Sequence, residues 1–165
     1  MRCGIALGSN LGDRIAHLRA GQAALVQLHT GKAGPLVSPI YETEPVDCDP
    51  GTAPYLNAVM EIEFEGAPVE LFHALQKIER DLGRPAEHAR NAPRTLDLDL
   101  LYAGDIALDT SELTLPHPRL AARRFVLQPL AKIRPALVLP GTQKTVAELL
   151  AGLPPAPGVT IALLP

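Results

Sequence analysis

The chain has 165 residues, 47% of them hydrophobic, so residues 1–165 are expected to form one globular domain rather than a disordered segment. A net charge of −3 argues against a nucleic-acid binder, because that class usually carries a basic surplus. Two cysteines, Cys3 and Cys48, are too few for a disulfide framework or a zinc site, and no apolar run suits a signal peptide or a membrane span. We therefore expect a cytoplasmic protein with free thiols.

The N-terminal segment predicts a strand, a helix and a second strand. An apolar run over residues 3–7 is typical of a buried strand, and the loop G-S-N-L-G of residues 8–12 follows it. Asp13 suits the N-terminus of a helix with helically spaced apolar residues, and Gly31 suits its end. Residues 36–41 form a further apolar run, which predicts the second strand.

The middle of the chain predicts a strand, a helix and two loops. Residues 55–64 place apolar side chains on one face and several polar ones on the other, which predicts a strand. Pro68 fits the first position of a helix that ends at Gly83. Residues 42–54 and 84–93 predict loops beside the site, and we expect both loops to close over bound substrates.

The rest of the chain begins with a strand over residues 95–102. Gly104 and Asp105 favour a hairpin turn, with residues 106–108 returning beside that strand. Three further elements are expected: a partly helical segment over 117–133, a short helix over 145–150 and a last strand over 159–164. The order β-α-β-β-α-β with C-terminal additions predicts an α+β, ferredoxin-like fold, in which helices pack on a mainly antiparallel sheet.

Two aspartates, Asp97 and Asp99, interrupt the apolar strand R-T-L-D-L-D-L-L-Y-A-G of residues 94–104. Residues two apart on a strand share a face, so the two Cα atoms are expected about 6–7 Å apart. Neighbouring carboxylates repel unless a cation lies between them or one of them is protonated. Mg²⁺ prefers oxygen ligands, and two such ions can bridge a polyphosphate. The alternative is a solvated sheet face on which the aspartates pair with arginines.

Three arginines, Arg84, Arg90 and Arg94, precede this pair. The guanidinium group offers a planar set of donors that suits phosphate oxygens, so carboxylates and arginines together indicate phosphoryl transfer. The chain has no Walker A motif and no G-x-G-x-x-G, so a nucleotide would be held by metals, arginines and loops. The alternative is that the arginines form surface ion pairs with nearby acids, namely Glu79, Asp81 and Glu87.

The run R-N-A-P-R-T-L-D-L-D-L-L, residues 90–101, resembles the signature of the 6-hydroxymethyl-7,8-dihydropterin pyrophosphokinases, an enzyme family of folate biosynthesis. Other segments resemble the family in the same order: A-L-G-S-N-L-G-D-R (6–14), Y-E-T-E-P (41–45), P-Y-L-N-A-V (54–59), I-E-R-D-L-G-R (78–84), L-T-L-P-H-P-R-L (113–120) and R-F-V-L-Q-P-L (124–130). The resemblance covers about residues 3–135.

The resemblance implies a reaction in which the hydroxymethyl oxygen of the pterin attacks the β-phosphorus of ATP. The pyrophosphoryl group then moves as a unit and AMP leaves. The resemblance also implies that Asp97 and Asp99 hold two Mg²⁺ ions, that Arg84 and Arg94 act on the triphosphate, and that the protein is a monomer. This agrees with the residues themselves, because arginines stabilise charge that develops on phosphate oxygens.

The resemblance further implies two sets of binding residues. The pterin set contains two aromatic rings suited to stacking and an amide suited to the ring edge, and its members are Thr43, Val46, Tyr55, Asn57 and Phe125. The ATP set is Gln76, Glu79, Thr114, His117 and Arg123. One departure stands out: the family often has a Trp where this chain has Asn91 and Ala92.

Two other functions stay open on the sequence. A nucleotidyltransferase also combines a Gly-Ser loop with D-x-D on a strand, but in that class the two lie close in sequence, whereas here Gly8 and Asp97 are far apart. A regulatory domain of ferredoxin-like fold would bind a ligand without catalysis. Such a domain would have no need of paired strand aspartates beside arginines.

Overall fold

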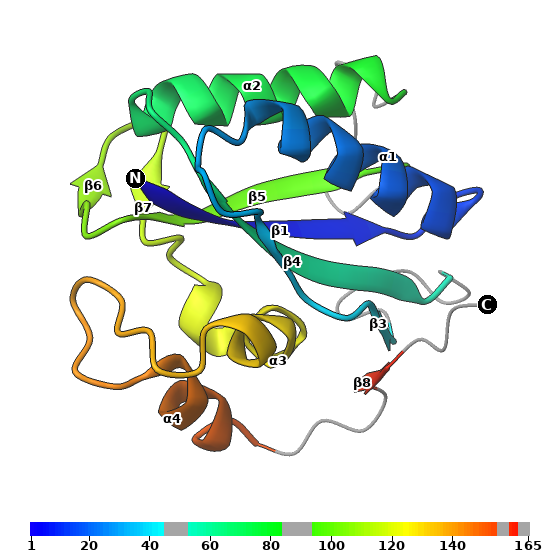
Figure 1. Ribbon diagram of the computed structural model, residues 1–165. Helices are drawn as coiled ribbons and strands as arrows, with labels where there is room; N and C mark the ends of the chain where they lie inside the picture. The colour runs from blue at the N-terminus through cyan, green and yellow to red at the C-terminus, as the bar shows by residue number, and fades with distance from the viewer. Residues whose placement is uncertain (45–52, 84–93, 155–158, 162–165) are drawn as a thin grey trace.

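The computed structural model of this chain describes residues 1–44, 53–83, 94–154 and 159–161 (Figure 1). The sheet is built from β1 (Arg2–Ser9), β3 (Tyr41–Thr43), β4 (Tyr55–Glu63), β5 (Asp97–Ala103) and β8 (Val159–Ile161), in the order β5-β1-β4-β3-β8. A further short strand, β2 (Leu36–Val37), also pairs with β4, and every pairing is antiparallel. This order and direction confirm the predicted ferredoxin-like core.

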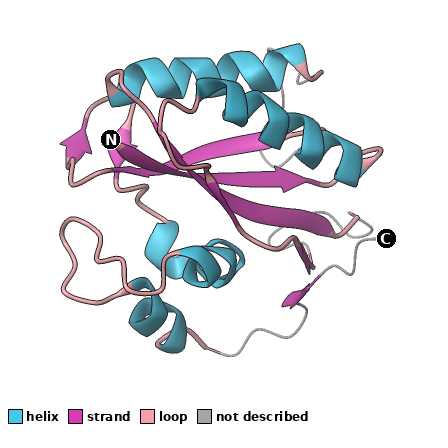
Figure 2. Ribbon diagram, in the orientation of Figure 1, coloured by secondary structure: helices cyan, strands magenta, loops and turns pink. Residues whose placement is uncertain are grey.

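Helices cover both faces of the sheet (Figure 2). The helices α1 (Arg14–Leu28) and α2 (Pro68–Asp81) lie on one face, and their apolar stripes pack against the inward side chains of β1, β4 and β5. The opposite face carries the 3₁₀ turn η1 (Leu120–Ala122), α3 (Arg124–Ile133) and α4 (Val146–Ala151). Across the described residues, no helix has the length and apolar character that a membrane crossing needs.

The first helix begins as predicted and ends earlier than predicted. Asp13 caps α1, since its side chain accepts the backbone N–H of Ala16 at 3.0 Å. The helix ends at Leu28, three residues before Gly31, because His29 leaves helical geometry with an extended backbone. The N–H of Thr30 instead donates to the carbonyl of Glu63 at 2.9 Å, which directs the chain along β4.

The strand predicted over residues 36–41 is divided into β2 and β3. Between them, Ser38 bonds twice to Val59 of β4: its N–H donates to the Val59 carbonyl, and its hydroxyl accepts the Val59 N–H, both at 2.9 Å. Pro39 follows and has no N–H to donate, so the regular ladder stops there and resumes at Tyr41.

The turn predicted at Gly104 and Asp105 forms, but the residues after it do not pair with β5 as predicted. Gly104 takes a φ of 54° and donates its N–H to the carbonyl of Arg2 at 2.7 Å, and the N–H of Ile106 donates to the carbonyl of Ala103 at 3.1 Å. The strand β6 (Leu108–Asp109) pairs instead with β7 (Thr114–Leu115). The edge of β5 is met further along the chain, where the N–H of His117 donates to the carbonyl of Leu101 at 2.8 Å.

A register shift in β5 sets the faces of its side chains. Leu98 and Leu100 point into the core under α1 and α2. The pairing with β1 then shifts: Ile5 is opposite Leu100 and Gly4 is opposite Tyr102, so Leu101 has no partner residue on β1. Leu101 and Tyr102 therefore both belong to the core under α3 and α4. Before the shift, Asp97 and Asp99 point to that same α3 side of the sheet, as the alternation predicts.

The end of the sheet beyond the shift is closed by a buried polar contact. The hydroxyl of Tyr102 donates to Glu61 Oε2 at 2.6 Å, and Arg134 Nε lies 3.2 Å from the same oxygen. Burial, followed by the bond to Glu61, raises the pKa of Tyr102 far above its ordinary value. The Tyr102 ring reaches Glu61 by lying directly over Gly4 of β1.

We predict that Gly4→Ala destabilises the fold strongly. A Cβ at position 4 would lie 2.1 Å from Tyr102 Cε1, and the buried ring has no room to retreat. The expected loss is about 1–3 kcal/mol or more of unfolding free energy, measured by urea denaturation. The double variant Gly4→Ala/Tyr102→Leu should recover part of this loss, and an unchanged stability of Gly4→Ala would contradict the packing described.

Candidate functional site

Three neighbouring strands place Asp97, Gly8 and Asn57 in one row on the α3 face of the sheet. Gly8 of β1 is paired with Asp97 of β5 on one side and with Asn57 of β4 on the other. A Cβ at Gly8 would stand 3.4 Å from Asn57 Oδ1 and 3.9 Å from the Asp97 Cβ. The position that a side chain of Gly8 would take is therefore vacant, and it lies between an amide and a carboxylate.

The two aspartates are partly exposed, and each is paired with an arginine. Arg94 Nη1 donates to Asp97 Oδ1 at 2.6 Å, and Arg123 Nη1 donates to Asp99 Oδ2 at 3.2 Å. The Asp97 side chain is 25% exposed and that of Asp99 is 37% exposed, so both carboxylates stay within reach of a ligand. Arg94 and Arg123 are more buried than these aspartates, which makes them part of the wall of the site.

Arg94 is held in place by a residue that the sequence did not single out. Asn10, in the loop between β1 and α1, is 3% exposed. The side-chain oxygen of Asn10 accepts the backbone N–H of Arg94 at 2.8 Å, and the backbone N–H of Asn10 donates to the Arg94 carbonyl at 3.1 Å. The G-S-N-L-G segment was the available signal, but it could not be assigned because its partner lies 84 residues further along the chain.

The predicted pterin residues that the structure describes gather at the other end of this row. Asn57 Nδ2 donates to Thr43 Oγ1 at 2.7 Å, and both side chains are buried. Tyr55 is half-buried and is the register partner of Thr43, so its side chain is on the same face. The Asn57 amide oxygen faces Gly8, where it is available to a ligand at the vacant position.

Phe125 and Arg123 reach the site from the N-terminal end of α3. The Arg123 guanidinium lies 5.5 Å from the centroid of the Phe125 ring, within the range of a cation–π contact. Because Arg123 also donates to Asp99, it connects the aromatic ring with the second aspartate. Phe125 is half-buried, which leaves part of its ring accessible.

A pocket of about 240 Å³ opens beside Asp99, on the side away from Asn57. Three of the predicted residues, Asp99, Thr114 and His117, line this pocket. Its other lining residues are mostly apolar and come from α2, β5 and the segment around β7: Phe72, Leu98, Leu100, Glu112, Leu113 and Pro118. The accessible lining of this pocket is polar and apolar in about equal parts, so it offers both contact surface and polar partners to a small molecule.

Three residues of the predicted ATP set, namely Gln76, Glu79 and Arg123, lie outside the lining of this pocket. Glu79 is buried and accepts the N–H of Leu98 at 2.6 Å, so its carboxylate covers the free edge of β5. Gln76, one turn earlier on α2, is half-buried. Val46, Arg84, Cys48 and the Asn91–Ala92 departure lie outside the described residues, as do most of the two predicted loops.

The carboxylates fit a metal that takes few protein ligands. Within the described residues, no group of three or more His, Cys, Asp or Glu side chains could hold a metal ion. Asp97 and Asp99 therefore suit Mg²⁺, which is usually bound by one or two carboxylates and completes its shell with phosphate oxygens and water. Zn²⁺ would need a third or fourth nitrogen or sulfur ligand.

Comparison with known proteins identifies the family. The 7,8-dihydro-6-hydroxymethylpterin-pyrophosphokinase (HPPK) family model matches residues 4–135. The chain belongs to this family. It is 46% identical over 129 residues to the Bacillus subtilis 2-amino-4-hydroxy-6-hydroxymethyldihydropteridine pyrophosphokinase, covering 78% of this chain and 75% of that protein. The Pseudomonas aeruginosa protein of the same name is 40% identical over 151 residues, covering 91% of this chain and 90% of the relative.

Solved structures agree at the level of the fold. The HPPK-DHPS structure from Plasmodium falciparum superposes with a TM-score of 0.67 at 13% identity, covering 91% of this chain and 44% of that chain. This chain likewise spans 20% of the folic acid synthesis protein of Schizosaccharomyces pombe, to which it is 38% identical. The HPPK chain thus matches one part of these larger proteins.

We predict that His117 makes the stability of this HPPK depend on pH. Burial lowers the pKa of His117 below its ordinary value, and Arg123 and Arg119 lower it further against the opposing effect of Asp99. Its Nδ1 accepts the Arg119 N–H at 3.1 Å, which requires that nitrogen to be unprotonated. The unfolded chain therefore binds this proton more readily, and stability should fall as the pH drops below about 6.5.

The measurement is urea unfolding of metal-free protein between pH 5 and pH 8, for the wild type and for His117→Asn. The variant should lose less stability than the wild type at the acid end. Parallel pH profiles for the two proteins would show that His117 does not carry this dependence.

Proposed function

We propose that this HPPK transfers the pyrophosphoryl group of ATP to the hydroxymethyl oxygen of 6-hydroxymethyl-7,8-dihydropterin, releasing AMP, as a step of folate biosynthesis. The observation that carries the proposal is the position of Asp97 and Asp99. They lie between a small-molecule pocket on one side and the row of Gly8 and Asn57 on the other. Two substrates in these places would meet at the aspartates.

ATP is assigned to the pocket beside Asp99. Thr114 and His117 line that pocket and offer polar contacts to the nucleoside, while its apolar walls suit a purine ring. The triphosphate would then run along Asp99 towards Asp97, where Arg123 and Arg94 supply guanidinium donors. Arg84 is a further triphosphate ligand in this proposal, and Gln76 and Glu79 support the nucleotide from α2.

The pterin is assigned to the space above Gly8. Asn57 offers an amide to the polar edge of the ring, and Thr43 already holds that amide in one orientation. Tyr55 and Phe125 come from β4 and α3 and supply aromatic surface for stacking. Val46 completes the predicted set. The hydroxymethyl group would then face Asp97 across Gly8.

Asp97 and Asp99 would hold two Mg²⁺ ions, which when bound neutralise charge on the triphosphate and lower the pKa of the attacking hydroxyl. In the structure each carboxylate is paired with an arginine. On binding, the carboxylates would hold the metal, and Arg94 and Arg123 would be released to the phosphates. This exchange predicts that metal and nucleotide bind together more tightly than either alone.

The transfer forms one bond and breaks one bond. The hydroxymethyl oxygen bonds to the β-phosphorus, the bond from that phosphorus to the α–β bridging oxygen breaks, and AMP leaves with the bridging oxygen. The hydroxyl proton passes to a carboxylate oxygen of Asp97 and on to water. The arginines hold the reacting groups in line and stabilise the charge that develops on the phosphate oxygens.

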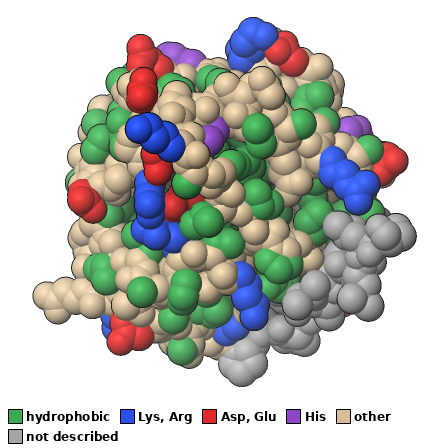
Figure 3. Space-filling view, in the orientation of Figure 1, with side chains coloured by type: hydrophobic (Ala, Val, Ile, Leu, Met, Phe, Trp, Pro, Cys, Tyr) green, Lys and Arg blue, Asp and Glu red, His purple; other side chains and the backbone are tan. Residues whose placement is uncertain are grey.

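We further propose that the enzyme works as a single-domain, cytoplasmic monomer, with ATP and the pterin as partners and without nucleic acid. Both hydrophobic clusters pack on one sheet, which supports a single domain. Several basic side chains on the face seen in Figure 3 lie beside acidic ones, an arrangement that does not favour a polyanion.

The decisive experiment is product analysis. Incubation with Mg²⁺, ATP and 6-hydroxymethyl-7,8-dihydropterin should yield AMP only when pterin and metal are both present. ADP in place of AMP would indicate transfer of the terminal phosphoryl group instead.

Asp97→Ala separates an enzyme from a binding module: an Mg²⁺-dependent transferase should lose nearly all turnover, whereas a regulatory domain should keep its ligand affinity.

We predict that Gly8→Ala keeps the fold and weakens pterin binding. The added methyl fits the ligand-free protein at ordinary contact distances, so the unfolding free energy should stay unchanged or rise by about 0.5–1 kcal/mol. The same methyl fills the space assigned to the ring, so the Kd for the pterin should rise at least about tenfold. Calorimetric titration tests this, and unchanged pterin affinity would place the ring elsewhere.

A further inference from the structure

We propose that the loop from Asn10 to Arg14 positions both halves of the site. Asn10 holds a residue assigned to the triphosphate, and Arg14 holds the strands that carry the residues assigned to the pterin. The proposal rests on the proposed function, since it assigns each end of the loop to one substrate. Asn10 bonds to the backbone of Arg94, and Arg14 bonds to Pro54 and Glu42. Both therefore act through other residues and are positioning residues rather than catalytic ones.

Asn10 acts through the backbone of Arg94. Its two hydrogen bonds, at 2.8 Å and 3.1 Å, extend the β1–β5 pairing past the last strand pair, Gly8 with Asp97. They fix the peptide from which the Arg94 side chain departs, and that side chain then reaches Asp97. Within the described part of the chain, the buried Asn10 Nδ2 has no hydrogen-bond partner, so the amide is held through its oxygen.

Arg14 acts on the end of the β3–β4 pair. Its Nη1 donates to the carbonyl of Pro54 at 2.6 Å and lies 3.1 Å from Glu42 Oε2. Glu42 precedes Thr43 and Pro54 precedes Tyr55, and these two following residues are register partners. One guanidinium therefore ties together the two strands that carry the predicted pterin contacts.

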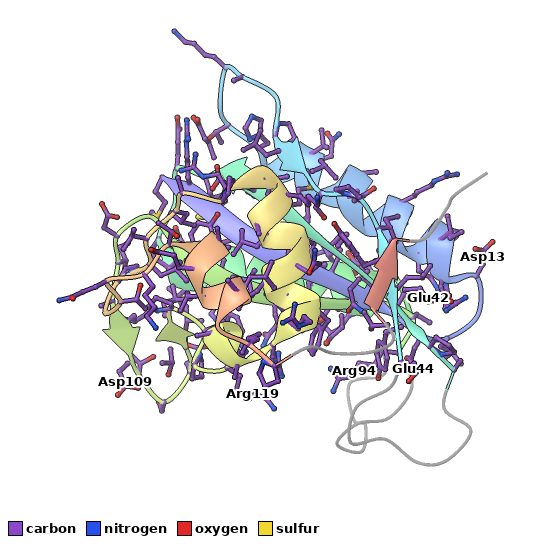
Figure 4. The ribbon with its side chains drawn as sticks, turned by 90° about the horizontal axis from the view of Figure 1, so that it is seen from below. Asp13, Glu42, Glu44, Arg94, Asp109 and Arg119 are labelled. Atoms are coloured by element: carbon purple, nitrogen blue, oxygen red, sulfur yellow. The ribbon has the colours of Figure 1, made fainter. Side chains whose placement is uncertain are left out.

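The loop between these two residues has a fixed shape. Gly12 takes a φ of 65°, which favours glycine, and its carbonyl accepts the N–H of Arg14 at 3.0 Å. Asp13 caps α1, and His17 Nδ1 lies 3.1 Å from the carbonyl of Leu11. Figure 4 shows Asp13, Glu42 and Arg94 at the same end of the molecule, although they come from three distant parts of the sequence.

A purely structural role and a positioning role predict different results. If the loop only stabilises the fold, substitutions at either end should lower stability and weaken both substrates alike. If it positions the site, each end should affect its own substrate. Loss of the Asn10 oxygen should disturb ATP and turnover, and loss of the Arg14 guanidinium should disturb the pterin.

The test uses Asn10→Leu and Arg14→Ala, with Asn10→Asp as the conservative variant that keeps the acceptor oxygen. Affinity is measured without turnover, by calorimetry with α,β-methylene-ATP and with the pterin. Asn10→Leu should lower kcat about 100-fold and leave the pterin Kd within about twofold. Arg14→Ala should raise the pterin Kd on the order of tenfold and leave the nucleotide Kd unchanged. Asn10→Asp should restore most of kcat.

Tyr102→Phe is the matched control, because it removes one buried hydrogen bond at the opposite end of β5. It should lower the unfolding midpoint without changing either affinity. The proposal would be overturned if both loop variants lost affinity for the ATP analogue and the pterin equally. It would also be overturned if Tyr102→Phe lost affinity in proportion to its lower unfolding midpoint, as the loop variants did. If the wild type binds both ligands and makes no AMP, the proposed function fails. The positioning role is still tested, because each variant should change the affinity for one ligand and not for the other.

Discussion

The pairing of β1 with both of its neighbours is the constraint on which the site depends. β1 is short of side chains on its α3 face, where Gly4, Ala6 and Gly8 alternate with core residues. At Gly4 the vacant position is filled by the Tyr102 ring, which closes one end of the sheet. At Gly8 no side chain fills the position between Asn57 and Asp97. One strand thus closes one end of the sheet and leaves a vacant position at the other, where our proposal places the pterin.

Charge is arranged so that the ligand-free site is not left with repelling carboxylates. Asp97 and Asp99 share a face, and each has a guanidinium at hydrogen-bond distance. The same guanidinium groups are the donors that a triphosphate would need. The two arginines thus stabilise two neighbouring aspartates on one face of the strand, and in the proposed reaction a metal and the phosphates would replace these arginine–aspartate pairs.

Family membership and geometry carry different parts of the functional argument. The match over residues 4–135 and the bacterial relatives at 40–46% identity establish the family. The geometry adds how this chain would perform the reaction: a pocket beside Asp99, a vacant position at Gly8, and an N-terminal loop that touches both sides. The structural match at 13% identity supports the fold alone.

The sequence by itself determined the order of elements and the face that the aspartates share, because both follow from local periodicity. The strands β4 and β5 and the cap at Asp13 depend on neighbouring residues, and they are confirmed. The polar face of β4 is nevertheless buried, because α3 covers it. The turn at Gly104 forms, but the strand after it pairs with β7 rather than with β5, because a turn signal does not fix the partner of the returning segment. Only the tertiary structure could join Asn10 to Arg94 and Arg14 to Pro54, since hydrogen bonds between residues 84 and 40 positions apart leave no periodic pattern in a sequence.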